Sequence, residues 1–226
     1  MYIVLTAATA GEISVTKSML DDKVSAMGSH ELEAAITGVG LVSTTYQLTR
    51  IINRRRPDLI LQAGIGGSYV PGRIGDVCSI FSDRFGDAGV TEHGHFRTVF
   101  DLQLADANAV PFQEGLLQNH HTNLLDIGGL ESVAASSVNE ITTDPERISW
   151  IQQNTSCIVE SMEGAAFHYV CLQEKIPFLQ IRSISNDVGE RDKSRWKIKD
   201  AIGALNEKLI LLIDKLTDPD ETNIRF

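Results

Sequence analysis

The sequence predicts an α/β fold, in which helices cover both faces of a central mixed sheet to give three layers, α/β/α. Two observations predict this class. Short apolar runs alternate along the chain with amphipathic or small-residue segments, the pattern of strands separated by helices. Small and polar residues gather directly after several of these runs, at the strand ends where open α/β sheets bind ligands. No internal repeat or linker interrupts the pattern, so we expect a single domain across residues 1–226, with 217–226 as a flexible tail.

The composition argues against several classes of protein. The formal net charge of −10 argues against a nucleic-acid partner. No apolar run approaches the roughly 20 residues of a membrane-spanning helix, so no membrane partner is expected. Residues 1–5 carry no basic stretch before their apolar segment, which argues against a signal peptide and for a cytoplasmic protein. The odd number of cysteines, 3, predicts buried free thiols, as in a reducing compartment.

The first half of the chain alternates strand and helix. We predict strands at 2–6, 33–37, 59–63 and 77–82. One helix is expected to follow the small-residue turn after the first strand and to end near Leu20. A second is expected from Leu41 to Arg55, where Pro57 terminates it. Glu12 stands at the start of the first helix, and a carboxylate at that place is explained by the helix alone.

Glycines follow two of the predicted strands. Gly38 and Gly40 form half of a dinucleotide-binding fingerprint, but Ser43 stands where its third small residue would be, so this interpretation is disfavoured. The run Gly64, Ile65, Gly66, Gly67 either lets the backbone approach a ligand closely or makes a tight turn.

The segment 83–130 is irregular and rich in Gly, His and Asn. Long irregular segments inside compact domains are often functional loops, and we expect this one to act as a lid over the substrate. His93 and His95 form a His-x-His pair and could meet a carboxylate on the substrate, as could Arg97. No third metal ligand stands at a diagnostic spacing, so we expect no metal and no cofactor.

The second half continues the alternation. A strand is predicted at 131–138, then a helix ending near Gln153 that begins at Pro145 and is capped by Thr143 or Asp144. A final helix is expected over 193–216, because its apolar residues recur with a 3.6-residue period.

The most informative stretch is 157–192, which reads as strand, helix, strand and polar loop. Glu163 stands at the start of its helix, where a carboxylate is favourable by itself. The helix does not explain why Arg182, Ser185, Asn186 and Asp187 crowd together where the second strand ends. Both polar groups fall at strand ends, which predicts a binding site there.

These residues carry a family resemblance. The string Glu-Ser-Met-Glu-Gly-Ala-Ala at 160–166 resembles the V-E-M-E-A-x-A signature of the purine nucleoside phosphorylase and methylthioadenosine/adenosylhomocysteine nucleosidase superfamily. Arg-Ser-Ile-Ser-Asn at 182–186 resembles its R-x-[IV]-S-[DN] signature, and the spacing between the two also fits. In detail, both strings are similar to those of the futalosine hydrolases.

The resemblance implies cleavage of an N-glycosidic bond. It implies that Glu12 activates the attacking water, that Glu163 holds the ribose hydroxyls and that Asn186 stabilises the departing purine. Ser161 and Gly64 stand where many members have Glu and Ser or Thr. The further substrate contacts implied are Gly64, Gly66, Gly67, Ile141, Ser161, Met162, Arg182 and Ser185. Arg182 is also expected to position Glu163 or the loop, and its alternative role is a structural ion pair.

The nature of the nucleophile and of the base follows from two residues. Leu61 stands where the hexameric phosphorylases have a phosphate-binding Arg, which favours water over phosphate. An Asn side chain can donate to O6 of a purine and accept from its N7–H, so Asn186 favours a 6-oxopurine over adenine. Asp187 is adjacent, and a shift of one residue would place an Asp at the base instead.

The resulting expectation is hydrolysis of futalosine to hypoxanthine and dehypoxanthine futalosine by a homo-oligomer, with a dimer favoured. The alternatives are a phosphorylase of 6-oxopurine nucleosides and a methylthioadenosine/adenosylhomocysteine-type nucleosidase. A non-catalytic nucleoside-binding protein is a third alternative, and it would not require Glu12.

Overall fold

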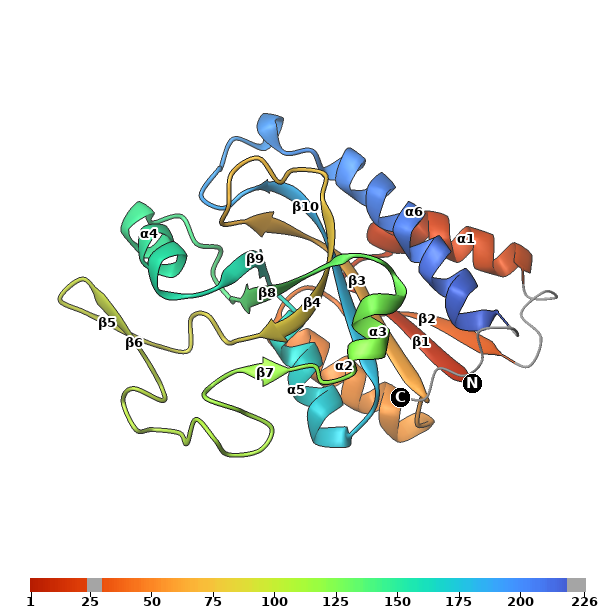
Figure 1. Cartoon of the computed structure of the whole chain (residues 1–226), viewed down its shortest axis with the longest axis horizontal. Helices are drawn as coiled ribbons and strands as arrows, with labels where there is room; N and C mark the ends of the chain where they lie inside the picture. Colours follow the sequence, from red (N-terminus) through yellow and green to blue (C-terminus); the bar gives the residue numbers. More distant parts are fainter. Residues whose placement is uncertain (24–29, 219–226) are drawn as a thin grey trace.

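The computed structural model describes residues 1–23 and 30–218, with side chains for 1–20 and 30–218. Its core is an eight-stranded mixed sheet between two layers of helices, which confirms the predicted three-layer architecture (Figure 1). The last part of the predicted tail, 219–226, lies outside the described residues. The strands are β1 (Tyr2–Ala7), β2 (Glu31–Ile36), β3 (Leu59–Ser68), β4 (Val77–Asp83), β5 (Gly89–Glu92), β6 (His95–Thr98), β7 (Leu117–Gln118), β8 (Glu131–Ser137), β9 (Cys157–Ser161) and β10 (Phe178–Asp187). The helices are α1 (Ser14–Lys23), α2 (Leu41–Arg54), α3 (Thr122–Ile127), α4 (Pro145–Asn154), α5 (Gly164–Glu174) and α6 (Ile198–Thr217), with short 3-10 turns η1 (Ala10–Ile13) and η2 (Lys193–Arg195).

The sheet runs β10-β4-β8-β9-β3-β1-β2, and β10 also pairs with β3. The first half of β3 lies between β1 and β10, whereas its last residues lie between β10 and β9. Strands β3, β10, β4, β8 and β9 therefore close into a ring, from which β1 and β2 extend as an open edge. This curvature brings the ends of β9 and β10 to the same part of β3.

The core follows the two-residue period of the strands. Ile3 and Leu5 of β1 face a buried cluster that includes the apolar side of α6, with Leu205 and Leu209. Tyr2 and Val4 face the opposite way, toward α2 and α5. Figure 1 shows α1 and α6 on one side of the sheet and α2 and α5 on the other. The layers hold the strand ends, and the side chains on them, in fixed positions.

The structure corrects the predicted lengths of β3 and β10. The glycine run 64–67 is not a turn but part of β3, and the polar residues 182–187 continue β10. The two strands pair as far as Asp187 with Ser68, so hydrogen bonding keeps both extended although their residues are poor strand formers. The final helix is shorter than predicted, because 193–195 form the separate turn η2.

The start of α4 is as predicted. Pro145 is its first residue, and the carboxylate of Asp144 caps it by accepting a hydrogen bond from the Glu146 N–H at 3.0 Å. In the part of the chain that the structure describes, no helix is long and apolar enough to cross a membrane.

Candidate active site

A cavity of about 400 Å³ lies where the segment after β1 meets the late residues of β3, β9 and β10. The loop after β10 and the first turns of α6 close its other side. Every predicted site residue lines it except Gly64 and Arg182. The lining residues are Ala8, Thr9, Glu12, Val39, Ile65, Gly66, Gly67, Ile141, Glu160, Ser161, Met162, Glu163, Ser185, Asn186, Val188, Gly189, Glu190, Trp196, Ile198 and Ile202.

Glu12 is buried and held by three donors. Its Oε2 accepts hydrogen bonds from the backbone N–H and the hydroxyl of Thr9, at 2.8 and 3.0 Å. Its Oε1 accepts from the backbone N–H of Ile65, at 3.1 Å. Each carboxylate oxygen can accept about two hydrogen bonds, so Oε1, on a residue that lines the cavity, keeps one acceptor position. The carboxylate is therefore fixed and still able to bind one more donor.

Glu163 lies at the N-terminal end of α5 and forms a buried ion pair with Arg182. Its Oε2 lies 3.2 Å from Nη1 of Arg182, and its Oε1 accepts from the backbone N–H of Gly40 at 3.1 Å. Arg182 also donates to Oε1 of Gln62 at 2.9 Å. Each oxygen of Glu163 retains one acceptor position, so the residue can receive two further hydrogen bonds.

Gly64 and Arg182, both expected as substrate contacts, are not among the residues that line the cavity. Arg182 pairs with Glu163, the positioning role that was also expected of it. The guanidinium of Arg182 passes directly over the Cα of Gly64, where a Cβ would overlap Nη1 and lie 3.1 Å from Oε1 of Glu12. Gly64 therefore provides the space through which Arg182 reaches Glu163. Arg182 is only 1% exposed and acts on the site through that carboxylate.

Asn186 lines the cavity, and Asp187 is not among the lining residues. The side-chain oxygen of Asn186 accepts from the hydroxyl of Ser185 at 2.8 Å, and its nitrogen donates to the carbonyl of Asp187 at 2.9 Å. One N–H and one acceptor position of the amide stay free. Ser185 therefore fixes the orientation of Asn186 while leaving it able to donate and to accept once.

Ser161 lines the cavity, but its hydroxyl proton is used inside the protein. Its Oγ lies 3.0 Å from Oγ of Ser137, which in turn donates to Oδ1 of the fully buried Asp83 at 3.0 Å. Because Ser137 has a single proton to give, Ser161 must donate to Ser137. Burial raises the pKa of the Asp83 carboxyl to about 7. Ser161 also accepts from the Gly164 N–H at 3.3 Å, so it mainly supports the start of α5.

Several lining residues were not predicted from the sequence. Glu160 is buried in the wall beside Ser161, although it lies within the recognised motif. Trp196, Ile198 and Ile202 form an apolar part of the wall at the start of α6. The 3.6-residue spacing of apolar residues predicted that α6 is a helix packed on the core. This spacing does not show that the first turns of the helix also face a cavity.

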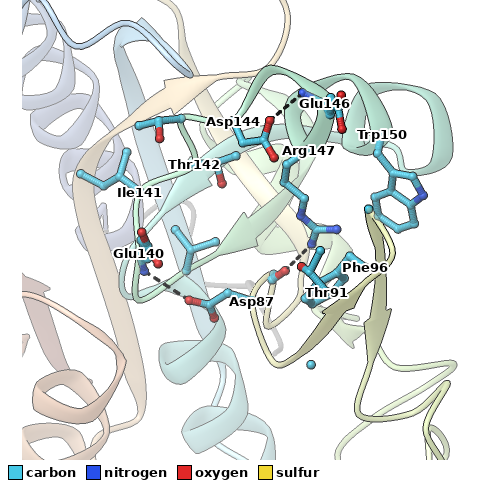
Figure 2. A pocket seen from close by; sticks show the side chains of 15 residues that line it. Asp87, Thr91, Phe96, Glu140, Ile141, Thr142, Asp144, Glu146, Arg147 and Trp150 are labelled. Carbon is cyan, nitrogen blue, oxygen red and sulfur yellow. Dashed lines mark hydrogen bonds between the residues drawn. The ribbon is translucent and has the colours of Figure 1, made fainter.

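A second cavity of about 340 Å³ lies between α4 and the β5–β6 hairpin (Figure 2). The guanidinium carbon of Arg147 lies 3.6 Å from the ring centre of Phe96 and 4.9 Å from that of Trp150. Its Nη2 donates to the carbonyl of Gly86 at 2.7 Å. Burial lowers the pKa of Arg147. Ile141 lines both cavities, so the loop before α4 separates them.

The segment 83–130, in which a lid was expected, packs at the second cavity in this structure. No residue of 83–130, a segment that the structure describes completely, lines the main cavity. The hairpin in this segment instead packs against α4 at the second cavity, through the contact between Phe96 and Arg147. His93, His95 and Arg97 belong to this hairpin region and do not line the main cavity.

Comparison with known proteins places the chain in a family. The model of the phosphorylase superfamily matches residues 25–217, and the chain belongs to this superfamily. It is 27% identical over 173 residues to the futalosine hydrolase of Thermus thermophilus, covering 75% of each chain. It is 26% identical over 191 residues to the 5'-methylthioadenosine/S-adenosylhomocysteine nucleosidase of Tolumonas auensis, covering 82% of this chain and 81% of that one.

Solved structures of Helicobacter pylori proteins share the fold. The futalosine hydrolase matches with a TM-score of 0.76 and 16% identity, covering 95% of this chain and 98% of that one. The 5'-methylthioadenosine/S-adenosylhomocysteine nucleosidase with butyl-thio-DADMe-Immucillin-A matches with a TM-score of 0.77 and 17% identity, at the same coverage. These likenesses confirm the architecture and leave the choice of substrate to the chemistry of the cavity.

Proposed function

We propose that the chain is an N-glycosyl hydrolase that cleaves futalosine to hypoxanthine and dehypoxanthine futalosine. The observation that carries the hydrolysis is the charge of the cavity. Its wall contains the carboxylates of Glu12, Glu160, Glu163 and Glu190, and no Lys, Arg or His among the described residues. A phosphate nucleophile needs fixed cationic donors, whereas cleavage of an N-glycosidic bond builds positive charge on the ribose. Carboxylates stabilise that charge and leave water as the nucleophile.

Three side chains supply the chemistry. Glu12 receives a proton from water through the free acceptor position on Oε1 and so directs the water to the anomeric carbon. Glu163 accepts hydrogen bonds from the ribose hydroxyls, while Arg182 and the Gly40 N–H hold it in place. As water bonds to the anomeric carbon, the C–N bond breaks and its electron pair goes to the base, whose developing negative charge Asn186 stabilises by donating to O6. The base takes its proton at N7 from solvent, and the Asn186 oxygen can then accept from that N7–H.

The 5′ substituent of the nucleoside is expected at the apolar end of the cavity. Val39, Ile198 and Ile202 supply apolar lining there, whereas Asn186 lies on β10 and Glu163 at the start of α5. An aromatic or thioalkyl group would gain about 25 cal/mol for each Å² of apolar surface that it buries there. This wall therefore suits a large, weakly polar substituent.

Purified protein supplied with futalosine, inosine and methylthioadenosine, each with and without phosphate, tests the proposal. We expect free hypoxanthine from futalosine, at a rate independent of phosphate, and a sugar product that carries no phosphate. A rate that strictly requires phosphate contradicts hydrolysis. Faster cleavage of methylthioadenosine than of futalosine contradicts the substrate and supports the second group of relatives, the methylthioadenosine nucleosidases.

Asn186→Asp should reverse the preference for the base. An ionised Asp would face O6 with lone pairs, whereas it can accept from a 6-amino group. We expect the ratio of kcat/KM for 6-oxo over 6-amino substrates to fall by about 10²-fold or more, because a mismatched buried edge leaves desolvated groups unpaired.

The matched control is Asp187→Asn, at the adjacent position that is not part of the lining. It should change the ratio little. If only Asp187→Asn collapses the ratio, Asp187 rather than Asn186 meets the base.

We further propose that the chain forms a dimer through the outer face of α2. Val42 is 79% exposed and Tyr46 60% exposed, and together with Leu41, Thr45 and Thr49 they line a shallow groove. Val39, 56% exposed, lies just before this face and also lines the main cavity. A second copy on α2 would bury this apolar surface and shield the rim of the cavity from water.

Tyr46→Glu should shift the particle from twice the chain mass to the mass of one chain in light scattering, because burying an unpaired carboxylate in an interface is costly. Leu211→Glu is the matched control, since Leu211 is 51% exposed on α6 in the opposite layer. Wild-type protein that runs as one chain at all concentrations contradicts the proposal.

A further inference from the structure

Asn186, Gly67 and Glu160 form one row across three neighbouring strands. Asn186 of β10 pairs with Gly67 of β3, and Gly67 pairs in turn with Glu160 of β9. Paired residues on adjacent strands present their side chains on the same face of the sheet. The amide and the carboxylate therefore stand on the same face, on either side of a glycine, and both line the main cavity.

The glycine leaves the middle of this row open. A Cβ at Gly67 would lie 3.0 Å from Cγ2 of Val188 and 3.4 Å from Nδ2 of Asn186, so a side chain there would crowd the Asn186 amide. Neighbouring strands lie about 4.8 Å apart, so Asn186 and Glu160 are separated by roughly 10 Å or less along a curved sheet. A flat bicyclic base fits such a span.

The Glu160 carboxylate is oriented from behind. Its Oε1 accepts from the backbone N–H of Thr142 at 3.0 Å, and its Oε2 accepts from the hydroxyl of the buried Tyr69. Burial, reinforced by the nearby Glu160 charge, raises the pKa of Tyr69, so the phenol remains a donor. Each carboxylate oxygen keeps one acceptor position. Glu160 is 6% exposed and lines the main cavity.

We propose that Glu160 selects the base by accepting the N1–H of a 6-oxopurine, while Asn186 reads O6 and N7 from the other side. This inference rests on the proposed function, which gives Asn186 its contact with the base. A 6-oxopurine has a donor at N1, whereas adenine has a lone pair there. Adenine would therefore set a lone pair against an ionised, buried carboxylate, and such mismatches are strongly discriminated. Glu160 and Asn186 together form a two-sided filter for hypoxanthine or guanine.

Glu160→Gln tests the selection with kcat/KM on 6-oxo and 6-amino nucleosides. The amide keeps one acceptor and gains a donor suited to N1 of adenine. We expect the 6-oxo over 6-amino ratio to fall by about 30-fold or more. If Glu160 only connects Tyr69 to the loop before α4, its replacement should lower kcat/KM on both substrates equally. An unchanged ratio therefore overturns the inference. Glu140→Gln, on the same loop but exposed and outside the main cavity, should leave both rates as in the wild type.

Binding of free bases separates this inference from the hydrolase proposal. Calorimetry with wild-type protein should show hypoxanthine binding at least tenfold more tightly than 1-deazahypoxanthine, in which a carbon replaces N1. This measurement needs neither catalysis nor a folded variant. Equal binding of the two bases, or no binding of either, overturns the role of Glu160. A clear preference for hypoxanthine without cleavage of any purine nucleoside supports this role and contradicts the hydrolase.

Discussion

Glu12→Gln is expected to lower kcat on futalosine by about 10²-fold or more, the usual contribution of a general base. The amide can still accept at its oxygen but cannot take a proton from water. In the structure Oε1 carries the free acceptor position, and the donors from Thr9 and Ile65 fix its direction. The loss should therefore appear in kcat, while KM changes less, because Glu12 acts on the water rather than on the nucleoside.

A control variant and an unfolding experiment test this expectation about Glu12. Glu207→Gln removes an exposed carboxylate on α6, outside the cavity lining, and should leave kcat unchanged. Thermal unfolding of Glu12→Gln shows whether replacing the carboxylate disturbs the turn at Thr9. A folded variant with near-normal kcat would mean that Glu12 serves only the start of its helix.

The parts of the fold that sequence predicted well are those whose local pattern agrees with their packing. β1 is a short continuous apolar run and α2 buries residues with a 3.6-residue period, and the structure places both within a residue of the predicted bounds. The late halves of β3 and β10 were missed because their glycines and polar residues do not resemble a strand. Those segments are extended because they pair with each other, and this pairing depends on the tertiary structure rather than on the local sequence.

The candidate site could likewise be predicted only in part from the sequence. The strand ends predicted that Glu163 and Asn186 would gather at one edge, and both line the cavity. Glu160 could not be assigned, because which side of a short buried strand faces a ligand depends on its register with Gly67. For Arg182 the resemblance implied a substrate contact, and a role in positioning Glu163 was expected as well. The structure shows the ion pair with Glu163 and leaves Arg182 out of the cavity lining, below Gly64.

Arg182→Leu should lower the free energy of unfolding by about 3–5 kcal/mol, the cost of breaking a buried ion pair by removing one partner. Leucine leaves the Glu163 carboxylate, which is buried, without its cation. It also removes the donor to Gln62. Denaturant unfolding measures this loss. Arg55→Leu, which breaks the exposed pair with Glu31, is the matched control and should cost no more than about 1 kcal/mol.

The double variant Arg182→Leu with Glu163→Gln shows whether the ion pair itself causes the loss. If the uncompensated carboxylate is the cause, the double variant should be more stable than the sum of the two single losses predicts, by about 0.5–3 kcal/mol. If the stability losses of the two single variants simply add, the loss in Arg182→Leu comes from the missing hydrogen bond to Gln62 and from lost packing contacts. Arg182→Lys keeps the charge but cannot reach Glu163 and Gln62 together as the forked guanidinium does. We expect its stability to fall between those of Arg182→Leu and the wild type, with KM raised because Glu163 is no longer held at the ribose.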